Sequence, residues 1–486
     1  MNVAIIGGGI GGLMSALLLS KRGFNVTIYE KESRLGGRLA FVEKDGFRID
    51  QGPTIVLLPK MLQTFLDEAG IDRTSYELVK CDPLYSIQFS DGLIYTKYPE
   101  LNRQQEEIER LFPSEIDGFN RFIKEGRTRF KIGKDAFLEK AFLSQKDFWT
   151  GKNVKSLMKL KPYQSVRRLM SNYFEDERLQ IAYSLQTLYI GGDPFQAPGM
   201  YSLVPFSEHE HGVYYIKGGY ASLVTVLEKE LRKRNVTIRL KEEVNHFHTS
   251  NNQVTGIKTI NGTDPYDLVI FNGDYPALFH LLGEKPKRIF TPSSGCVLLY
   301  VGLNKIYENA NVHQFFISEN FSENMKDVFE RKVVPKNPSF YTFHPSIIDE
   351  SLAPPGKGVL YTLIPVPSGV HIKWEQEEKW IQTIIDRMEE LAFPRLKESI
   401  EWMEIRTPKD AYDFGLFKGG SFGIAPTLFQ SGLFRPQIKP LRYENLYAVG
   451  ASVHPGGGVP IVMQGVKILV DQVLRDYAQL GVSVHA

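Results

Sequence analysis

The 486-residue chain contains only two cysteines, Cys81 and Cys296, which lie far apart in the sequence. Neither belongs to a C-x-x-C pair or to zinc-site spacing, so we expect no disulfide scaffold and no metal site, and a reducing compartment suits the chain. No stretch of about 18 uncharged apolar residues occurs, so no transmembrane helix is predicted. Because the first expected strand starts at residue 2, there is no room for a cleaved signal peptide, and we expect a cytoplasmic protein.

The charges nearly balance. A net charge of +2 at pH 7 gives no global case for nucleic-acid binding. The motifs G-x-S-x-G and H-E-x-x-H are absent, and no familiar catalytic nucleophile or metal-ligand set is apparent. Aromatic residues are plentiful, with 23 tyrosines and 31 phenylalanines, which suits a large apolar cavity as well as a large core. The length predicts two domains.

The first 38 residues carry the most informative pattern in the chain. An apolar run at 2–6 is followed at once by Gly7-Gly-Gly-Ile-Gly-Gly12, then by a helix-forming stretch at 13–21. A second apolar run at 26–29 ends in Glu30. Strand, G-x-G-x-x-G, helix, strand and acid in this order predict a βαβ unit that binds a dinucleotide.

Each glycine of this turn has an expected task. Gly7 allows the tight turn, Gly9 lets the backbone approach a pyrophosphate, and Gly12 lets helix and strand pack closely. Gly11 is also expected in the cofactor site. The helix N-terminus offers unpaired N–H groups to the pyrophosphate, and Glu30 is placed to accept hydrogen bonds from a ribose. Glycine-rich turns also serve plain packing, which is the alternative interpretation.

Leu35-Gly36-Gly37-Arg38 follows Glu30 a few residues later. An acid followed by Gly-Gly-Arg resembles the flavoprotein superfamily of amine oxidases, protoporphyrinogen oxidases and carotenoid desaturases; a solvated turn is the alternative. Because of this resemblance, we expect the dinucleotide to be FAD rather than NAD. It also implies that Gly37 and Arg38 are cofactor-side residues, with Arg38 near the phosphates or the ring edge, and that the backbone of Val244 meets the adenine.

Apolar runs and turn signals predict the elements that follow. A hairpin is expected at 84–98 around Ser90-Asp91-Gly92, and helix-like periodicity dominates from there to about residue 190. Strands are expected at 268–271 and 296–303. A last short strand at 446–450 leads into a glycine-rich block and then a helix from about residue 461 to 477.

That block, Ala451-Ser-Val-His-Pro-Gly-Gly-Gly-Val-Pro460, narrows the resemblance. Together with the stretches at 185–194, 201–205 and 212–219, it resembles the bacterial carotenoid (phytoene) desaturases, and most closely the C30 dehydrosqualene (4,4'-diapophytoene) desaturases. The resemblance covers nearly the whole chain. Donor N–H groups and a helix N-terminus at the block would stabilise the negative charge of a reduced flavin. The expected ring-side residues are Gly450, Gly458, Val459 and Pro460.

The implied fold class is α/β, with a Rossmann-like FAD-binding domain of the amine oxidase/phytoene desaturase type. The implied fold also has an inserted α+β substrate domain and a helical region that could associate with a membrane. We expect the FAD-binding domain to combine residues 1–80, 206–290 and 410–486. The substrate-binding region is expected at 81–205 and 291–409.

The resemblance implies an FAD-dependent desaturase of a long apolar isoprenoid, dehydrosqualene first of all, that forms diaponeurosporene-type products. In the implied mechanism, flavin N5 takes a hydride and a base takes the adjacent proton, and oxygen or a quinone accepts the electrons. The alternatives are an aldehyde-forming carotenoid terminal oxidase and a non-enzymatic prenyl-binding protein of the same fold. Candidate proton-transfer groups are His454, which could equally fix its loop, and Glu208, whose run of four titratable residues could equally be a solvated loop.

Residues 127–168 contain twelve Lys and Arg residues but only three Asp and Glu, with Phe, Trp and Leu between them. Such a mixture suits contact with an anionic lipid surface. A solvated basic face over a helical core is the alternative, and nucleic acid is the least favoured reading because no nucleic-acid module accompanies the charge. A carotenoid substrate dissolved in lipid favours the lipid-contact interpretation, so we expect peripheral association with the inner face of the cell membrane.

Overall fold

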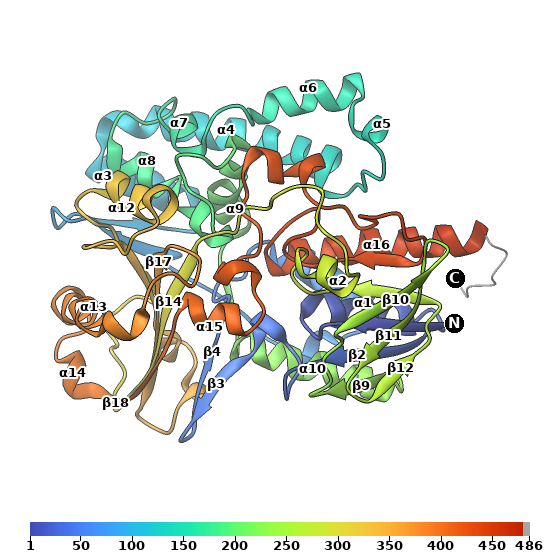
Figure 1. The fold of residues 1–486 in the computed structure, drawn as a ribbon. Coiled ribbons are helices and arrows are strands. Elements are labelled where there is room, and N and C mark those ends of the chain that lie inside the picture. The colour runs from blue at the N-terminus through green and yellow to red at the C-terminus, as the bar shows by residue number, and fades with distance from the viewer. Residues whose placement is uncertain (480–486) are drawn as a thin grey trace.

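The computed structural model describes residues 1–479, and its two largest sheets lie beneath a layer of helices (Figure 1). Parallel strands from three distant parts of the sequence form the first sheet, in the order β19-β13-β1-β2-β9. Their bounds are Asn2–Ile6 for β1, Asn25–Glu30 for β2, Thr237–Leu240 for β9, Leu268–Phe271 for β13 and Leu446–Ala448 for β19. The start, middle and end of the chain therefore meet in one sheet.

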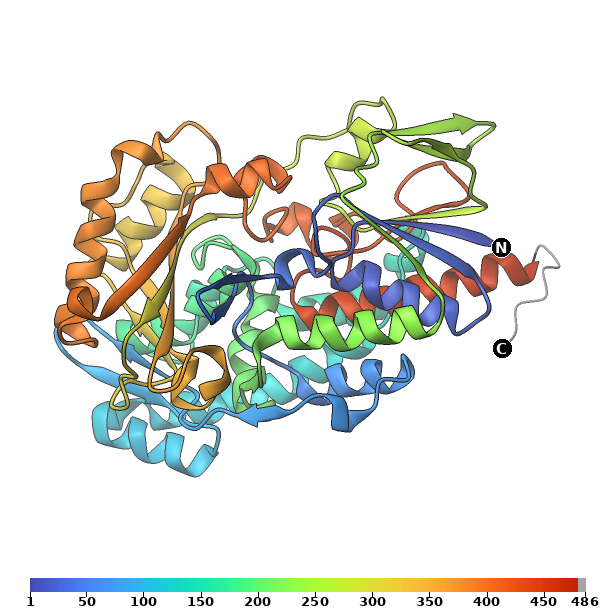
Figure 2. The same cartoon turned by 90° about the horizontal axis from the view of Figure 1, so that it is seen from below.

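Covering layers bury both faces of this parallel sheet, as the apolar runs of its central strands require. Figure 2 shows helices α1, α10 and α16 stacked on one face and an antiparallel sheet, β10-β11-β12, beyond the other. The helices span Ile10–Ser20, Gly219–Lys233 and Val459–Gln479, and α2 (Pro59–Glu68) packs against α16. The three antiparallel strands span His246–Ser250, Gln253–Thr259 and Gly262–Asp264.

The second sheet has seven strands in the order β18-β14-β17-β16-β15-β6-β7, all antiparallel except β15 and β6. In that order the strands span Ile400–Arg406, Gly295–Leu303, Gly358–Val366, Phe340–Phe343, His313–Phe316, Tyr85–Gln88 and Ile94–Lys97. Alternation along β14 divides its two faces. Val297 and Leu299 join the core under helix α13 (Glu378–Leu391), whereas Leu298 and Tyr300 line a cavity on the other side.

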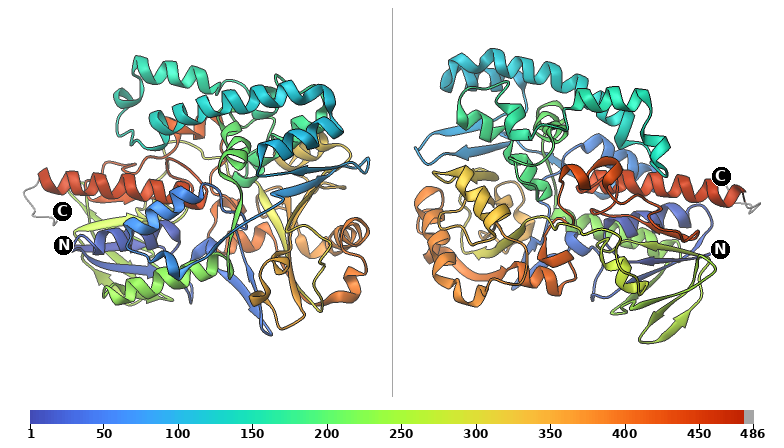
Figure 3. Two further views of the ribbon diagram at one scale, coloured as in Figure 1. Left: turned by 180° about the vertical axis from the view of Figure 1, so that it is seen from behind. Right: turned by 45° about the horizontal axis from the view of Figure 1, so that its top comes forward.

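Short helices between residues 101 and 211 form the layer over both sheets, seen from two further directions in Figure 3. They are α3 (Leu101–Leu111), α4 (Ile116–Gly133), α5 (Gln145–Phe148), α6 (Gly151–Leu160), α7 (Val166–Met170), α8 (Glu177–Ala182) and α9 (Leu203–His211). The other short elements are β3 (Phe41–Lys44), β4 (Phe47–Asp50), β5 (Leu78–Lys80), β8 (Tyr214–Ile216), α11 (Ala277–Leu281), α12 (Phe321–Lys326), α14 (Leu396–Ser399) and α15 (Pro408–Asp413). Within residues 1–479, no helix is long and apolar enough to cross a membrane.

The strands predicted at 2–6 and 268–271 have those bounds, and the hairpin expected at 84–98 is β6 and β7. Two expectations need correction. The first helix begins at Ile10 rather than residue 13, so part of the glycine motif is helical. The run Glu208 to His211 is not a solvated loop: it is the end of helix α9, and Glu208 is completely buried.

Candidate active site

A cavity of about 1530 Å³ lies between the two sheets and the helical layer. Its lining includes residues at the carboxyl ends of β1, β2 and β13, where ligands of open α/β sheets bind, and residues of β14, β15, β16 and β17. The volume exceeds the roughly 300–1,000 Å³ of a typical small-molecule pocket. One cavity therefore has room for a dinucleotide and a long second ligand.

The glycine turn at the first sheet is packed too tightly for side chains. Gly7 has φ +101°, and Asn272 donates an amide N–H to the Gly7 carbonyl over 3.0 Å. A Cβ on Gly11 would lie 2.3 Å from Oδ1 of Asn272, and one on Gly12 would lie 2.1 Å from the Gly7 oxygen. Gly7, Gly9 and Gly11 line the cavity, whereas Gly12 lies behind them at the helix–strand contact.

Glu30 ends β2 and lines the same part of the cavity. One of its carboxylate oxygens accepts the N–H of Gly8 over 2.8 Å, and the other accepts the N–H of Glu32 over 2.9 Å. Each oxygen can accept a further hydrogen bond, which is what a ribose diol needs. Among residues 1–479, no side chain caps the N-terminus of α1, so its first N–H groups are available to a pyrophosphate.

Arg38 extends this half of the site. The turn before it folds onto the glycine loop, because the N–H of Gly36 donates to the Gly8 carbonyl over 2.9 Å and Gly37 has φ +55°. An Arg38 guanidinium nitrogen lies 3.7 Å from a carboxylate oxygen of the buried Asp274. Its Nε is buried and has no hydrogen-bond partner among the described residues, so it is free to hold a phosphate or ring-edge oxygen.

The C-terminal part of the chain completes the dinucleotide half of the cavity. Gly450 has φ +124° two residues after the end of β19, and Gly458 has φ +102° directly before α16. Both line the cavity and present backbone without a side chain. The residues predicted for a cofactor that line the cavity are Gly7, Gly9, Gly11, Glu30, Gly37, Arg38, Val244, Gly450, Gly458, Val459 and Pro460. Asn272 and Asp274 were missed, although their place directly after strand β13 was a usable signal.

The other half of the cavity is apolar and aromatic. Its wall is formed by Leu185, Leu188, Tyr189, Leu203, Val204, Leu298, Tyr300, Phe315, Tyr341, Tyr361 and Leu363. One polar row interrupts it. The Tyr341 hydroxyl hydrogen-bonds Oγ1 of Thr54 over 2.7 Å and Nδ1 of His313 over 2.7 Å. Burial lowers the pKa of His313 to about 3, so its ring is neutral at pH 7. Nothing in the sequence pattern indicated this row.

The two residues expected to transfer protons lie in different places. His454 lines the cavity, whereas Glu208 does not. Glu208 lies in the layer behind the wall, where its neighbour Ser207 faces the cavity and its own carboxylate pairs with Lys97. Glu208 therefore reaches the cavity only through the residues of the wall.

Comparison with known proteins identifies the family of this chain. The family of flavin containing amine oxidoreductases matches residues 10–464. The chain belongs to this family. The flavoenzyme is 54% identical over 480 residues to a 4,4'-diapolycopen-4-al dehydrogenase of Metabacillus indicus, with 98% of each chain covered. It is 31% identical over 497 residues to a 4,4'-diaponeurosporene-forming 4,4'-diapophytoene desaturase of Staphylococcus haemolyticus, with 98% and 99% covered.

The resemblance to carotenoid desaturases is thus confirmed. An oxidoreductase from Methanosarcina mazei shares the fold, with a TM-score of 0.65 at 17% identity over 97% of this chain and 100% of that one. The flavoenzyme is an FAD-dependent oxidoreductase, as predicted, and its FAD-binding fold of the amine oxidase type is the one expected from the sequence. The uncapped helix, the tight glycine turn and the unpaired Nε of Arg38 fit FAD.

His454 ties the C-terminal block to the helical layer. Its Nε2 lies 3.2 Å from the carbonyl oxygen of Phe137 and 3.0 Å from that of Lys140, and the Phe142 ring packs edge-on against it at 5.4 Å. Burial lowers the pKa of His454 to about 4, so the ring is neutral at pH 7 and its Nε2–H donates to these carbonyls. This geometry suits a residue that fixes its loop.

Replacement of His454 by alanine is expected to lower the free energy of unfolding by about 1–3 kcal/mol, because two buried carbonyls lose their donor. The folded-state pKa near 4 lies below the ordinary 6.5, so the unfolded chain binds the proton first and the stabilisation is lost as pH falls from about 6.5 towards 4. Denaturation curves of wild type and His454→Ala at pH 6.5 and pH 4 measure this difference. A kcat/KM inflection between about pH 5 and pH 8 that His454→Gln abolishes would instead assign proton transfer to His454.

Proposed function

We propose that this flavoenzyme oxidises the end of a long acyclic carotenoid, taking a terminal aldehyde to a carboxylic acid. The observation that carries the proposal is the single cavity in which an apolar, aromatic half continues into the dinucleotide half. A substrate without charge must be bound through apolar burial, and this wall supplies it. The 54% identity to a 4,4'-diapolycopen-4-al dehydrogenase supports an aldehyde at the reacting end.

The proposed reaction balances with one water molecule. Water adds to the aldehyde, and the hydrate loses a hydride from carbon and a hydroxyl proton, which passes to water, to give the acid. FAD, when bound, supplies the hydride acceptor, and oxygen or a quinone finally takes the two electrons. The chain's own part is to exclude bulk water along the polyene and to orient the oxygenated end. Thr54 and Tyr341 line the cavity, with His313 hydrogen-bonded behind Tyr341, and they offer a polar position in the largely apolar wall for that end.

Desaturation of 4,4'-diapophytoene is the second candidate. The 31% identity to a 4,4'-diapophytoene desaturase over nearly the full chain favours it, and so does the same apolar wall. This reaction adds no oxygen. It forms each double bond by removing a hydride and a proton from neighbouring carbons. The proton acceptor would then be Nδ1 of His454, which has no hydrogen-bond partner among the described residues, because Glu208 does not line the cavity.

Incubation of FAD-loaded protein with each substrate in liposomes separates the two reactions. With 4,4'-diapolycopen-4-al, we expect a product that is heavier by one oxygen atom and behaves as an acid. With 4,4'-diapophytoene, desaturation would give a product lighter by two hydrogens for each new double bond. Mass spectrometry and visible absorbance read both outcomes. No product from either substrate, with oxygen and with a quinone supplied, would refute both candidates.

We further propose that the mouth of the cavity rests on an anionic lipid bilayer. Exposed apolar side chains of the basic segment are Leu143, Trp149, Val154, Met158 and Tyr163. Trp149 also lines the cavity, as do Leu428 and Phe434 from a distant exposed segment, so this surface adjoins the cavity. Apolar side chains inserted among lysines would let a lipid-dissolved carotenoid enter without crossing water.

Charge reversal on α6 is expected to release the protein from such a bilayer. Lys152, Lys155 and Lys159 are exposed on this helix. Each basic residue near an anionic surface contributes about 1 kcal/mol, so the triple Lys→Glu variant should bind phosphatidylglycerol vesicles at least tenfold more weakly in cosedimentation. The matched control reverses Lys229, Arg232 and Lys233 on α10, on the opposite side of the molecule (Figure 1). Equal loss in both variants would contradict the proposed surface.

A further inference from the structure

An ion pair without any solvent exposure lies behind the apolar wall of the cavity. Nζ of Lys97, at the end of β7, is 2.7 Å from a carboxylate oxygen of Glu208 on α9, and both side chains are 0% exposed. Removing two charges from water is costly, and a well-packed apolar pair is often at least as stable in such a place. Core stability alone is therefore a weak explanation for this pair.

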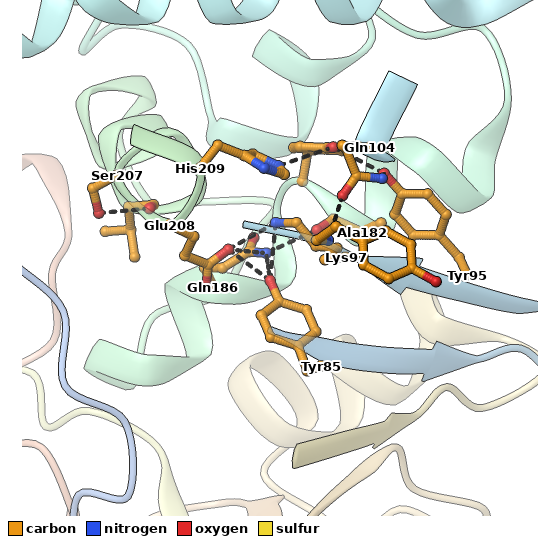
Figure 4. Close-up of polar contacts among 12 residues, drawn as sticks. Tyr85, Tyr95, Lys97, Gln104, Ala182, Gln186, Ser207, Glu208 and His209 are labelled. Carbon is orange, nitrogen blue, oxygen red and sulfur yellow. Dashed lines mark hydrogen bonds and ion pairs between the residues drawn. The ribbon is translucent and has the colours of Figure 1, made fainter. Parts of the chain in front are cut away.

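The pair holds together elements that come from separate parts of the chain (Figure 4). The same Glu208 oxygen accepts the Tyr85 hydroxyl of β6 over 2.6 Å. That hydroxyl in turn accepts Nζ of Lys97 over 2.9 Å and Nε2 of Gln186 over 2.8 Å. Gln186 lies on the short 3-10 helix η5 (Leu185–Ile190). Directional hydrogen bonds thus join α9, η5 and the β6–β7 hairpin at one point.

Each of these elements also supplies, or directly supports, part of the cavity wall. Helix η5 contributes Leu185, Leu188 and Tyr189, and α9 contributes Leu203, Val204 and Ser207. The Tyr85 ring packs edge-on, at 5.0 Å, against Phe315, another wall residue. Tyr189 lines the cavity and stacks on Phe315 with ring centroids 6.1 Å apart. Burial, and next the charge of Glu208, raise the pKa of its hydroxyl well above the usual value.

We propose that Lys97 and Glu208 are positioning residues that fix the apolar wall and thereby set which length of polyene the cavity accepts. Apolar contacts alone would let η5 and α9 slide over the sheet, because dispersion forces have little directionality. A network of charged hydrogen bonds has one arrangement and restricts that motion. The inference rests on the proposed function for the class of substrate, an acyclic polyene.

The test compares how tightly FAD-loaded protein binds 4,4'-diapolycopene, an acyclic C30 polyene, and lycopene, its C40 homologue. Quenching of tryptophan fluorescence gives both dissociation constants without turnover. Wild type should prefer the shorter chain. Lys97→Met combined with Glu208→Leu keeps the volume but removes the network, and the preference should fall about tenfold, the size of effect that small pocket changes produce. The matched control is Lys80→Met with Glu100→Gln, an exposed pair at 2.9 Å, which should change nothing.

An unaltered preference in a folded, FAD-loaded double variant would overturn the proposal and leave the pair a purely structural role. Tyr85→Phe keeps the ion pair and the 3.3 Å hydrogen bond from Gln186 to Glu208, but it removes the hydroxyl that joins both to the hairpin, and it should lower the preference as well. If the double variant does not fold, an unaltered preference in Tyr85→Phe overturns the proposal. Absence of turnover on every carotenoid refutes only the proposed function, because the binding ratio is measured independently.

Discussion

Replacement of Gly12 by valine is expected to give protein that is purified without FAD. A Cβ at this position would lie 2.1 Å from the backbone oxygen of Gly7 and 3.1 Å from the side-chain nitrogen of Asn272. A backbone oxygen cannot move aside as a side chain can, so the helix must leave the strand. Overpacking of this kind costs about 1–3 kcal/mol and often more. Because we expect Gly7 and α1 to hold the pyrophosphate of FAD, that displacement should remove the cofactor.

The ratio of flavin absorbance to protein measures this outcome, and titration with added FAD measures the remaining affinity. Gly12→Ala is the milder variant and should bind FAD at least about tenfold more weakly, which corresponds to roughly 1.4 kcal/mol. Gly151→Ala is the matched control, because a Cβ there meets no atom of the described part of the chain within 4 Å. Wild-type FAD content in Gly12→Val would show that the turn tolerates a side chain and that our account of it is wrong.

The sequence predicted the elements whose signals are local. Strand β1, the glycine turn and Glu30 occupy consecutive residues, and each is constrained by its immediate neighbours in the chain. The C-terminal block could be assigned as well, because a strand, three glycines and a helix N-terminus also lie in a row. For such motifs, backbone geometry depends on the residue types themselves, so a single sequence is sufficient.

The wall and the ion pair could not be predicted in this way. Lys97 and Glu208 are 111 residues apart, and nothing in either neighbourhood selects the other. Glu208-His-Glu-His211 is a polar run of the kind found on surfaces, yet the structure buries its first two residues. Helix α9 is buried because the second sheet and the helical layer close over it. That is a property of the whole fold, not of the local pattern.

Glu208→Gln is expected to lower the free energy of unfolding by about 3–5 kcal/mol, because it leaves Lys97 as an uncompensated buried cation. Burial lowers the pKa of Lys97, and the charge of Glu208 opposes that effect in the wild type. Without Glu208, the folded protein loses this proton at a lower pH than the unfolded chain does. The unfolded chain then binds more protons in the window between the two pKa values, so the variant is expected to gain stability as pH rises from 6.5 towards 9.

Urea denaturation at both pH values measures the loss and its recovery. Lys97→Met added to Glu208→Gln removes the stranded cation and leaves a neutral acceptor for Tyr85, so the double variant should regain most of the lost stability and lose the pH dependence. Glu100→Gln, in the exposed pair with Lys80, should cost at most about 1 kcal/mol. If Glu208→Gln cost no more unfolding free energy than Glu100→Gln, the charges of Lys97 and Glu208 would not be paired away from water. The position of the cavity wall would then not depend on them. A large loss that is recovered in the double variant would establish that charge pairing, rather than side-chain volume, holds α9 to the β6–β7 hairpin.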